Sequence, residues 1–419
     1  MPSKSAFGGL QFNARYFIIT LNKVRCELPE KYEKASQAIN QDVSGKVTGM
    51  PSSQKKYNAL KLTVGLVGSL INIAYLVAVT LSGVAKSLEQ WVHQLTANPY
   101  IAFLLYIFVI GSGNAILTFP LSFYSSYILE HRFELSHQTF GSWVREGMKS
   151  LSIGLVLAVP LALAVFAMLR ILSWWWWLGT ATLLFVVSIL LARIAPILIF
   201  PIFYKFTPLE DADLKSRIER LCAEQGVNVS GIYVFNYSKD TRKANAAFAG
   251  LGRTKRILLA DTLLNGFTYD EIEAVFAHEL GHYVQNHIWK GIAIQTAMTF
   301  AGLAVVAVMY SYSLSWIGAS SFDTLSALPL LMLWLSVYGL VITPIGNIIS
   351  RAFERSADRY ALLSSSSSAR RTDAFISAMR RLAELNLADE APNAVVEFLL
   401  YSHPSISRRI SFAESLSKS

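Results

Sequence analysis

Residues 268–313 read TYDEIEAVFAHELGHYVQNHIWKGIAIQTAMTFAGLAVVAVMYSYS and join two kinds of sequence without a break. The first part carries charged residues and three histidines. The second part, Ile292–Ser313, is apolar and long enough for the ~30 Å hydrocarbon layer of a bilayer, which a helix crosses with about 20 residues. The stretch therefore predicts a polar helix at a membrane surface, followed directly by a membrane span.

The polar part has the features of a capped amphipathic helix. Thr268 is a suitable N-terminal cap, and Glu271, three residues later, completes a capping box. Apolar residues then recur with the 3.6-residue period of an α-helix, at Ile272, Val275, Phe276, Leu280, Tyr283 and Val284. The motif in residues 278–282 is therefore expected to lie on a helix.

His278-Glu279-Leu280-Gly281-His282 is an H-E-x-x-H motif, with the two histidines one turn apart so that both imidazoles can reach one ion. Glu279 lies beside that face and is better placed to take a proton from water than to bind the metal. Zinc lowers the pKa of bound water from about 15.7 toward 7, which gives a hydroxide able to attack a peptide carbonyl. Chance predicts roughly 0.005 matches per chain, so two surface histidines are the weaker interpretation.

A hydrolytic zinc site also needs a third protein ligand and an open fourth position. The metzincin pattern requires a glycine and a histidine where this chain has Gln285 and Ile288, so that class is excluded. His287 has a suitable side chain, but it follows His282 by five residues and would be turned away from the ligand face of the helix.

A better source of the third ligand follows the last apolar segment. Glu354 and Asp358 are spaced i and i+4, so they share one face of a helix. One carboxylate could bind zinc while the other accepts a ring N–H from a ligand histidine. An exposed acidic pair beside Arg351 and Arg355 is the alternative.

Composition indicates a membrane protein, since 53% of residues are hydrophobic and only 16% are charged, against roughly 25% in ordinary globular proteins. Six apolar segments could cross a bilayer: Leu62–Val84, Tyr100–Leu129, Leu151–Leu169, Ile171–Leu191, Ile292–Ser313 and Leu325–Ile349. Between the fourth and fifth, a polar helix (Leu209–Gln225) and two strand-like stretches (Gly231–Phe235 and Lys255–Leu259) predict a small α/β unit.

The predicted organisation has five parts. They are a polar cytosolic segment (1–57), four transmembrane helices (58–204), a cytosolic α/β part with the H-E-x-x-H helix (205–290), two transmembrane helices (291–350) and a C-terminal part that supplies the third ligand (351–419). We therefore expect a mainly α-helical polytopic membrane protein of about six transmembrane helices with a small α/β peptidase domain.

The distribution of basic residues sets the orientation. Of the 37 Lys and Arg, all but Lys86 and Arg170 fall on one side, so both termini are expected in the cytosol. The tryptophans Trp91, Trp174–Trp177 and Trp316 fall at the outer boundaries and predict an aromatic belt. The membrane would be the bacterial inner membrane or that of the endoplasmic reticulum.

Other classes find no support in the sequence. Basic residues are not interleaved with aromatics as in a nucleic-acid groove, so no nucleic-acid partner is expected. Cys26 and Cys222 are far apart and are expected to be free thiols. The apolar run Tyr16–Leu21 is too short for a signal peptide, so targeting is expected from the first span.

Together with H-E-x-x-H, five further motifs resemble the M48 family of peptidases, specifically the zinc-dependent CAAX prenyl proteases, over residues 58–412. The motifs are Lys205–Asp211 (KFTPLED), Asn245–Phe248 (NAAF), Lys255–Leu259 (KRILL) leading to Asp261-Thr262, Glu354…Asp358, and His403-Pro404-Ser405…Arg409. The resemblance implies a gluzincin-like peptidase domain on the cytosolic side with one Zn²⁺ per chain.

The resemblance also implies residue roles. Glu354 would be the third zinc ligand beside His278 and His282, with Asp358 as the hydrogen-bond partner of a ligand. His403 would donate to the developing oxyanion, and Arg409 would contact the substrate or a site carboxylate. Residues of an edge strand would pair with the substrate backbone, namely Asn245, Ala246 and Phe248.

Two departures from the family pattern stand out: residues 1–57 offer no additional N-terminal span, and Ala247 replaces an aromatic residue. The substrate is expected to be a peptide or protein, prenylated or otherwise membrane-associated, with membrane lipids around the chain. The alternatives are a quality-control protease of the HtpX kind and a non-catalytic scaffold or transporter. Few charges lie inside the six segments, which disfavours transport.

Overall fold

Long helices dominate the computed structural model, which describes residues 53–249, 256–363 and 368–418. Within these ranges, six helical segments are long and apolar enough to cross a membrane: Ser53–Leu81, Pro99–Arg132, Phe140–Ile171, Ser173–Phe203, His287–Ile317 and Leu325–Leu363. The expected six spans are thus confirmed. Several helices extend past their apolar run into polar sequence, as where Leu151–Leu169 belongs to a helix that begins at Phe140. Cys26 lies outside the described residues.

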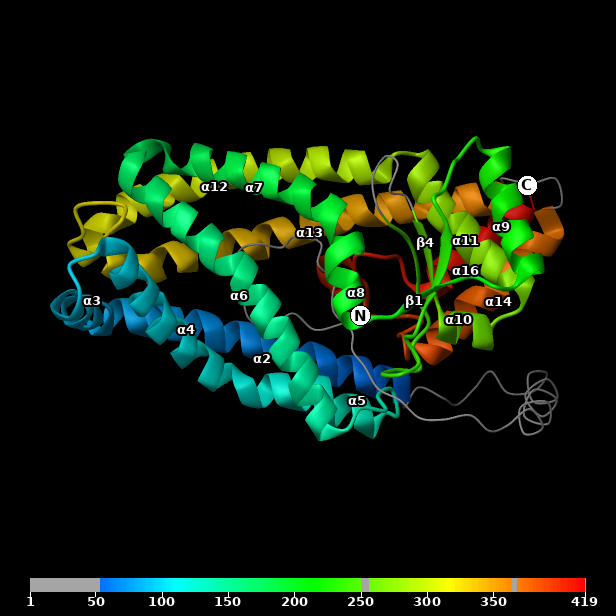
Figure 1. The fold of residues 1–419 in the computed structure, drawn as a ribbon, viewed down its shortest axis with the longest axis horizontal. Coiled ribbons are helices and arrows are strands. Elements are labelled where there is room, and N and C mark those ends of the chain that lie inside the picture. The colour runs from blue at the N-terminus through cyan, green and yellow to red at the C-terminus, as the bar shows by residue number, and fades with distance from the viewer. Residues whose placement is uncertain (1–52, 250–255, 364–367, 419) are drawn as a thin grey trace.

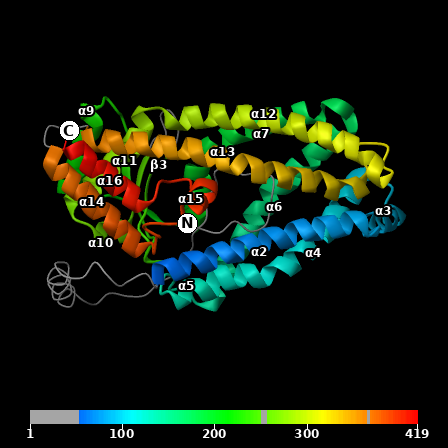
Figure 2. The ribbon, with the colours of Figure 1, turned by 180° about the vertical axis from the view of Figure 1, so that it is seen from behind.

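Neighbouring long helices contact one another in a closed cycle (Figures 1 and 2). The order around the cycle is α2 (Ser53–Leu81), α4 (Pro99–Phe123), α6 (Phe140–Ile171), α7 (Trp176–Ile194), α12 (His287–Leu314) and α13 (Leu328–Leu363), which returns to α2. The six long helices of the described residues are therefore enough to close the cycle.

Several of these helices are extended by short turns. A π-helical turn (Tyr124–Ile128) leads from α4 into α5 (Leu129–Arg132), and another (Ala195–Ile199) leads from α7 into α8 (Phe200–Phe203). Short 3₁₀ turns lie at Ser173–Trp175, Ser315–Ile317 and Leu325–Ala327.

At the end far from the sheet, α3 (Val84–Leu95) packs with the long helices around a buried aromatic cluster (Figure 1). Phe103 and Phe166 stack with ring centroids 4.2 Å apart. Trp176 is only 1% exposed and belongs to this cluster, whereas Trp175 is 57% exposed. The aromatic-belt prediction is therefore wrong for Trp176, because its ring fills the core between helices.

A small sheet lies at the opposite end of the molecule (Figure 1). The strand order is β1 (Phe206–Pro208), β2 (Ile232–Phe235), β4 (Arg256–Ala260) and β3 (Ala246–Ala249). β2 and β4 are parallel, while β1 and β3 pair antiparallel with their neighbours. Strand β3 thus forms one edge of the sheet, and its Ala246 pairs with Leu259 of β4.

Among the described residues, six helices make up the rest of this end of the molecule. They are α9 (Ala212–Glu224), α10 (Asp261–Gly266), α11 (Tyr269–Val284), α14 (Ser368–Leu385), α15 (Ala394–Leu400) and α16 (Ile406–Ser417). α9, α10, α11 and α14 pack on the sheet or its core, and α15 and α16 pack on α13 and α14. Cys222 on α9 is free, as expected. It is also buried, and burial raises the pKa of its thiol to about 11.

A close approach of α11 to α13 joins the sheet end to the membrane helices. Gly281 lies at the crossing, where an added Cβ would come 3.2 Å from the Cα of Ala357. At the end of α11, the Gln285 side chain donates to the carbonyl of Ser356 at 3.1 Å. These contacts place the last turns of α13 beside the H-E-x-x-H helix.

Candidate metal centre

Helix α11 carries two histidines whose ring nitrogens face each other. The helix begins at the expected capping box, because Thr268 accepts from the backbone N–H of Glu271 while the Glu271 carboxylate accepts from that of Thr268. His278 and His282 lie one turn apart, and their Nε2 atoms are 3.2 Å apart. Both rings thus present the same nitrogen to one point.

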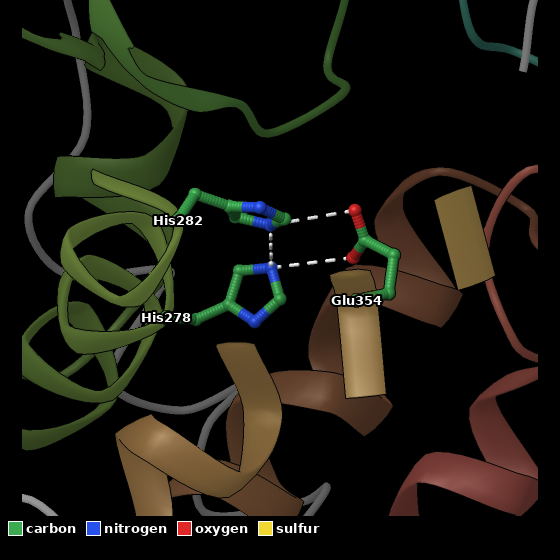
Figure 3. Close-up of side chains that lie close together, drawn as sticks. All are labelled: His278, His282 and Glu354. Carbon is green, nitrogen blue, oxygen red and sulfur yellow. Dashed lines mark hydrogen bonds and ion pairs between the residues drawn. The ribbon is translucent and has the colours of Figure 1, made fainter. Parts of the chain in front are cut away.

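Glu354 on α13 completes the cluster from another helix (Figure 3). Its Oε2 lies 3.3 Å from His278 Nε2, and its Oε1 lies 3.4 Å from His282 Nε2. The residue is only 4% exposed, and its Oε2 makes no hydrogen bond to any described residue. A buried carboxylate oxygen without a hydrogen bond is costly unless a cation satisfies it.

The spacing of these donor atoms fits a tetrahedral metal ion. Ligand bonds of about 2.0–2.2 Å in a tetrahedron place neighbouring donor atoms about 3.3–3.6 Å apart. The two Nε2 atoms are 3.2 Å apart, each lies 3.3–3.4 Å from one of the two Glu354 oxygens, and one donor atom from each residue falls within 4.8 Å of the others, which is close enough for a shared ion. Among the described residues, His278, His282 and Glu354 are the one group of three such side chains close enough to hold an ion.

Asp358, one turn beyond Glu354, holds the opposite side of the His278 ring. Its Oδ1 is 2.8 Å from His278 Nδ1, and Arg409 of α16 donates from Nε to Asp358 Oδ2 at 2.8 Å. Burial opposes a charge on His278, but the nearby carboxylates of Asp358 and Glu354 outweigh it and raise the pKa of the ring to about 10. A metal ion at this position must therefore displace a proton.

Two further predicted residues lie around the ligands. Burial raises the pKa of the Glu279 carboxyl, which suits a group that takes up and returns a proton. His403 places its Nε2 3.1 Å from Glu354 Oε1, and its side chain is 39% exposed. The acidic pair on α13 is buried rather than exposed, and Arg351 does not pair with it but donates to the carbonyl of Glu397 at 3.0 Å.

The residues expected to contact substrate lie on or beside the edge strand β3. Asn245 is exposed directly before the strand, and its carbonyl accepts from the backbone N–H of Ala260 at 3.0 Å. Ala246 is buried, whereas Phe248 stacks on Tyr283 of α11 with centroids 4.9 Å apart. The strand thereby lies against the helix that carries the histidines.

One contact of the cluster was not predicted from the sequence. His287 Nδ1 lies 3.0 Å from His282 Nδ1, although a continuous helix would turn the two side chains apart. The helix is not continuous here, since Asn286 has φ 57° and ψ 33° between α11 and α12. An Asn at the end of a helical pattern was the available sequence signal, because Asn tolerates this left-handed conformation.

Comparison with known proteins agrees with this geometry. The profile described as Peptidase family M48 matches residues 208–417, half of the chain. The chain belongs to peptidase family M48. A second profile, described as CAAX prenyl protease N-terminal with five membrane helices, matches residues 32–205.

One relative is similar to the chain along most of its length and another along about half of it. An uncharacterized metalloprotease of Bacillus subtilis, YhfN, is 29% identical over 366 residues, which cover 86% of this chain and 84% of the relative. CAAX prenyl protease 1 of Saccharomyces cerevisiae is 37% identical over 211 residues, 49% of this chain and 46% of the relative.

A solved structure has the same fold. The crystal structure of S. mikatae Ste24p matches with a TM-score of 0.76 and 24% identity, covering 93% of this chain and 100% of that chain. Membership of M48 makes the chain a metallopeptidase, as expected from the motifs, and not a non-catalytic scaffold or transporter. The six apolar helices and the match to the N-terminal membrane-helix family make it a multi-pass membrane protein.

Proposed function

We propose that the chain is a zinc endopeptidase that cleaves near the C-terminus of prenylated, CAAX-type or similar membrane-associated proteins. The observation that carries the proposal is the convergence of His278, His282 and Glu354, whose donor atoms, one from each residue, lie within 4.8 Å of one another. Relatives named CAAX prenyl protease 1 and the M48 profile support the substrate class.

The proposed mechanism assigns each residue one task. Zinc held by His278, His282 and Glu354 would activate a water molecule and polarise a carbonyl. Glu279 takes the proton of the attacking water and returns it to the leaving amine, for which its raised pKa is suited. His403 donates to the oxygen that becomes negatively charged.

Substrate binding is proposed at β3. An extended peptide can add to the exposed edge of a sheet through backbone hydrogen bonds. Asn245, Ala246 and Phe248 would supply this edge. Arg409 has a different proposed task, because its bond to Asp358 supports the ligand His278 instead of the peptide.

The proposed location is a membrane with the peptidase end in the cytosol. The distribution of Lys and Arg supports this orientation, since basic residues concentrate on the cytosolic side of membrane proteins. The bacterial inner membrane and the endoplasmic reticulum both meet this requirement.

The catalytic proposal is tested with Glu279→Gln. Zinc content should stay at one per chain while peptide turnover falls by roughly 10²–10⁴-fold, because the base is lost and the ligands remain. Glu273→Gln on the same helix is the control, since Glu273 lies 3.7 Å from Arg217 and not at the ligands. Retained turnover in Glu279→Gln would refute the assignment.

The substrate class is tested separately with one C-terminal peptide in farnesylated and unlipidated forms. Products are read by mass spectrometry, and faster cleavage of the farnesylated peptide is expected. Equal cleavage of both forms would leave a zinc endopeptidase without the proposed lipid preference.

A further inference from the structure

The two ligand histidines have different partners at the ring nitrogen that faces away from the cluster. His278 Nδ1 lies 2.8 Å from a carboxylate oxygen of Asp358. His282 Nδ1 lies 3.0 Å from Nδ1 of His287. The Nε2 atoms of both ligands face each other and Glu354, so Nδ1 is the nitrogen left to be fixed on each ring.

The contact between His282 and His287 defines the proton arrangement. When Nε2 of His282 binds a metal, Nδ1 must carry the hydrogen and donate it. His287 Nδ1 then accepts, so the His287 ring is neutral with its hydrogen on Nε2. His287 is not itself a ligand in this arrangement, because its near nitrogen is used by the ring of His282.

His287 is in turn held by the membrane helices. It is the first residue of α12 and is 6% exposed. Its ring stacks on Phe353 of α13 with centroids 4.4 Å apart and an interplanar angle of 9°. Phe353 directly precedes the ligand Glu354 in the sequence, and His287 contacts the ligand His282. The stack therefore connects the surroundings of two ligands that lie on different helices.

The turn between α11 and α12 makes this contact feasible. Asn286 adopts the left-handed conformation, and the backbone N–H of Asn286 donates to the carbonyl of Tyr283 at 2.9 Å. The helix is therefore interrupted within the few residues after His282, which brings the His287 ring back to it.

We infer that His287 is a positioning residue of the metal centre, which holds His282 in its ligand orientation and ties it to α12 and α13. The inference rests on the proposed zinc site and deepens it. Partners that bind the outer nitrogen of a ligand histidine fix its tautomer and ring orientation, and their loss weakens metal binding by about 10–100-fold. Here that partner is a neutral ring on a membrane helix instead of a carboxylate.

The test compares two substitutions in the full-length protein. His287→Phe keeps an aromatic ring for the stack on Phe353 but removes the acceptor. His287→Asn loses the ring but places a carbonyl oxygen near the position of Nδ1. Zinc affinity is measured by competition with a chelator, and the absorption spectrum of the Co²⁺-loaded protein reports ligand geometry.

Zinc affinity should fall by about 10–100-fold in His287→Phe, with a changed Co²⁺ spectrum, and should stay close to wild type in His287→Asn. His93→Phe on α3, at the other end of the molecule (Figure 1), is the control and should change neither measurement. Wild-type affinity in His287→Phe, or an equal loss in His287→Asn, would overturn the inference.

Two outcomes separate this inference from the proposed function. Absence of zinc from the wild-type protein refutes the proposed site itself, whereas zinc-loaded wild type with an unaffected His287→Phe refutes only the role of His287. Circular dichroism of each metal-free variant checks folding. If His287→Phe does not fold, His287→Ala replaces it and the same contrast with His287→Asn decides.

Discussion

Adding one methyl group at Gly281 should disturb the metal centre without touching a ligand. In Gly281→Ala, the new Cβ would lie 3.0 Å from Cδ1 of Tyr360, 3.1 Å from its Cβ and 3.2 Å from the Cα of Ala357. The first of these atoms can rotate away, but the backbone of Ala357 can move only if α13 moves. Ala357 lies between Glu354 and Asp358 on that helix, so both carboxylates would shift with it.

The expected magnitude combines two opposing effects. Replacing a helical glycine by alanine stabilises by up to about 1 kcal/mol through helix propensity. Overpacking a tight contact costs about 1–3 kcal/mol. We expect a net loss of up to about 2 kcal/mol in the free energy of unfolding, and a fall in peptide turnover on the order of tenfold from displaced ligands.

Gly291→Ala is the matched control, because Gly291 also lies on a helix and its added Cβ would meet nothing within 4 Å. The measurements are thermal unfolding in detergent, zinc content and peptide turnover for both variants. If Gly281→Ala were stabilised as much as Gly291→Ala with unchanged turnover, the close approach of α11 and α13 would not constrain the site.

Three further predictions concern pH, a buried charge cluster and the metal. Burial raises the pKa of the Asp240 carboxyl to about 8, whereas the carboxyl of the unfolded chain has a pKa of ~3.9. Between these two pH values the folded chain keeps a proton that the unfolded chain releases, so the free energy of unfolding should fall as the pH rises. Asp240→Asn should therefore raise the melting temperature more at about pH 8.5 than at about pH 5, and an equal effect at both would contradict this. Glu130 contacts the ammonium groups of Lys61 and Lys243, so Glu130→Gln leaves the buried Lys243 and the partly buried Lys61 without their carboxylate and should cost about 3–5 kcal/mol in thermal unfolding. The exposed Glu134→Gln should cost little. Chelation should abolish turnover and added zinc should restore it, while turnover that persists after the metal is shown to be removed would exclude a metal mechanism.

Local sequence predicted those features that depend on nearby residues. Apolar runs of about 20 residues indicated the membrane helices, because the thickness of the bilayer sets their length. Thr268 and Glu271 predicted the start of α11, since a capping box uses groups three residues apart. The i, i+4 spacing of Glu354 and Asp358 put both carboxylates on one face, and their approach to the histidines was implied by family resemblance.

Features set by distant or irregular contacts were not predictable in the same way. The pattern of Ala246–Ala249 is weak for a strand, because alanine has low strand propensity and only pairing with β4 defines it. Trp176 was expected at a membrane boundary, but tertiary packing buries it against Tyr310. The contact of His287 with His282 depends on the left-handed Asn286, which residue spacing on a regular helix does not reveal.

The metal centre belongs to the membrane helices as much as to the sheet. In the proposed site α11 supplies two donors, and the third donor, Glu354, comes from the end of a helix that begins among the membrane spans. The groups that contact the outer nitrogens of the two histidine rings also come from membrane helices, since Asp358 lies on α13 and His287 begins α12. A fragment with only the sheet and α11 would keep two of three donors and lose both ring partners. On the proposed assignment, tight zinc binding would therefore require α12 and α13 to be packed against α11.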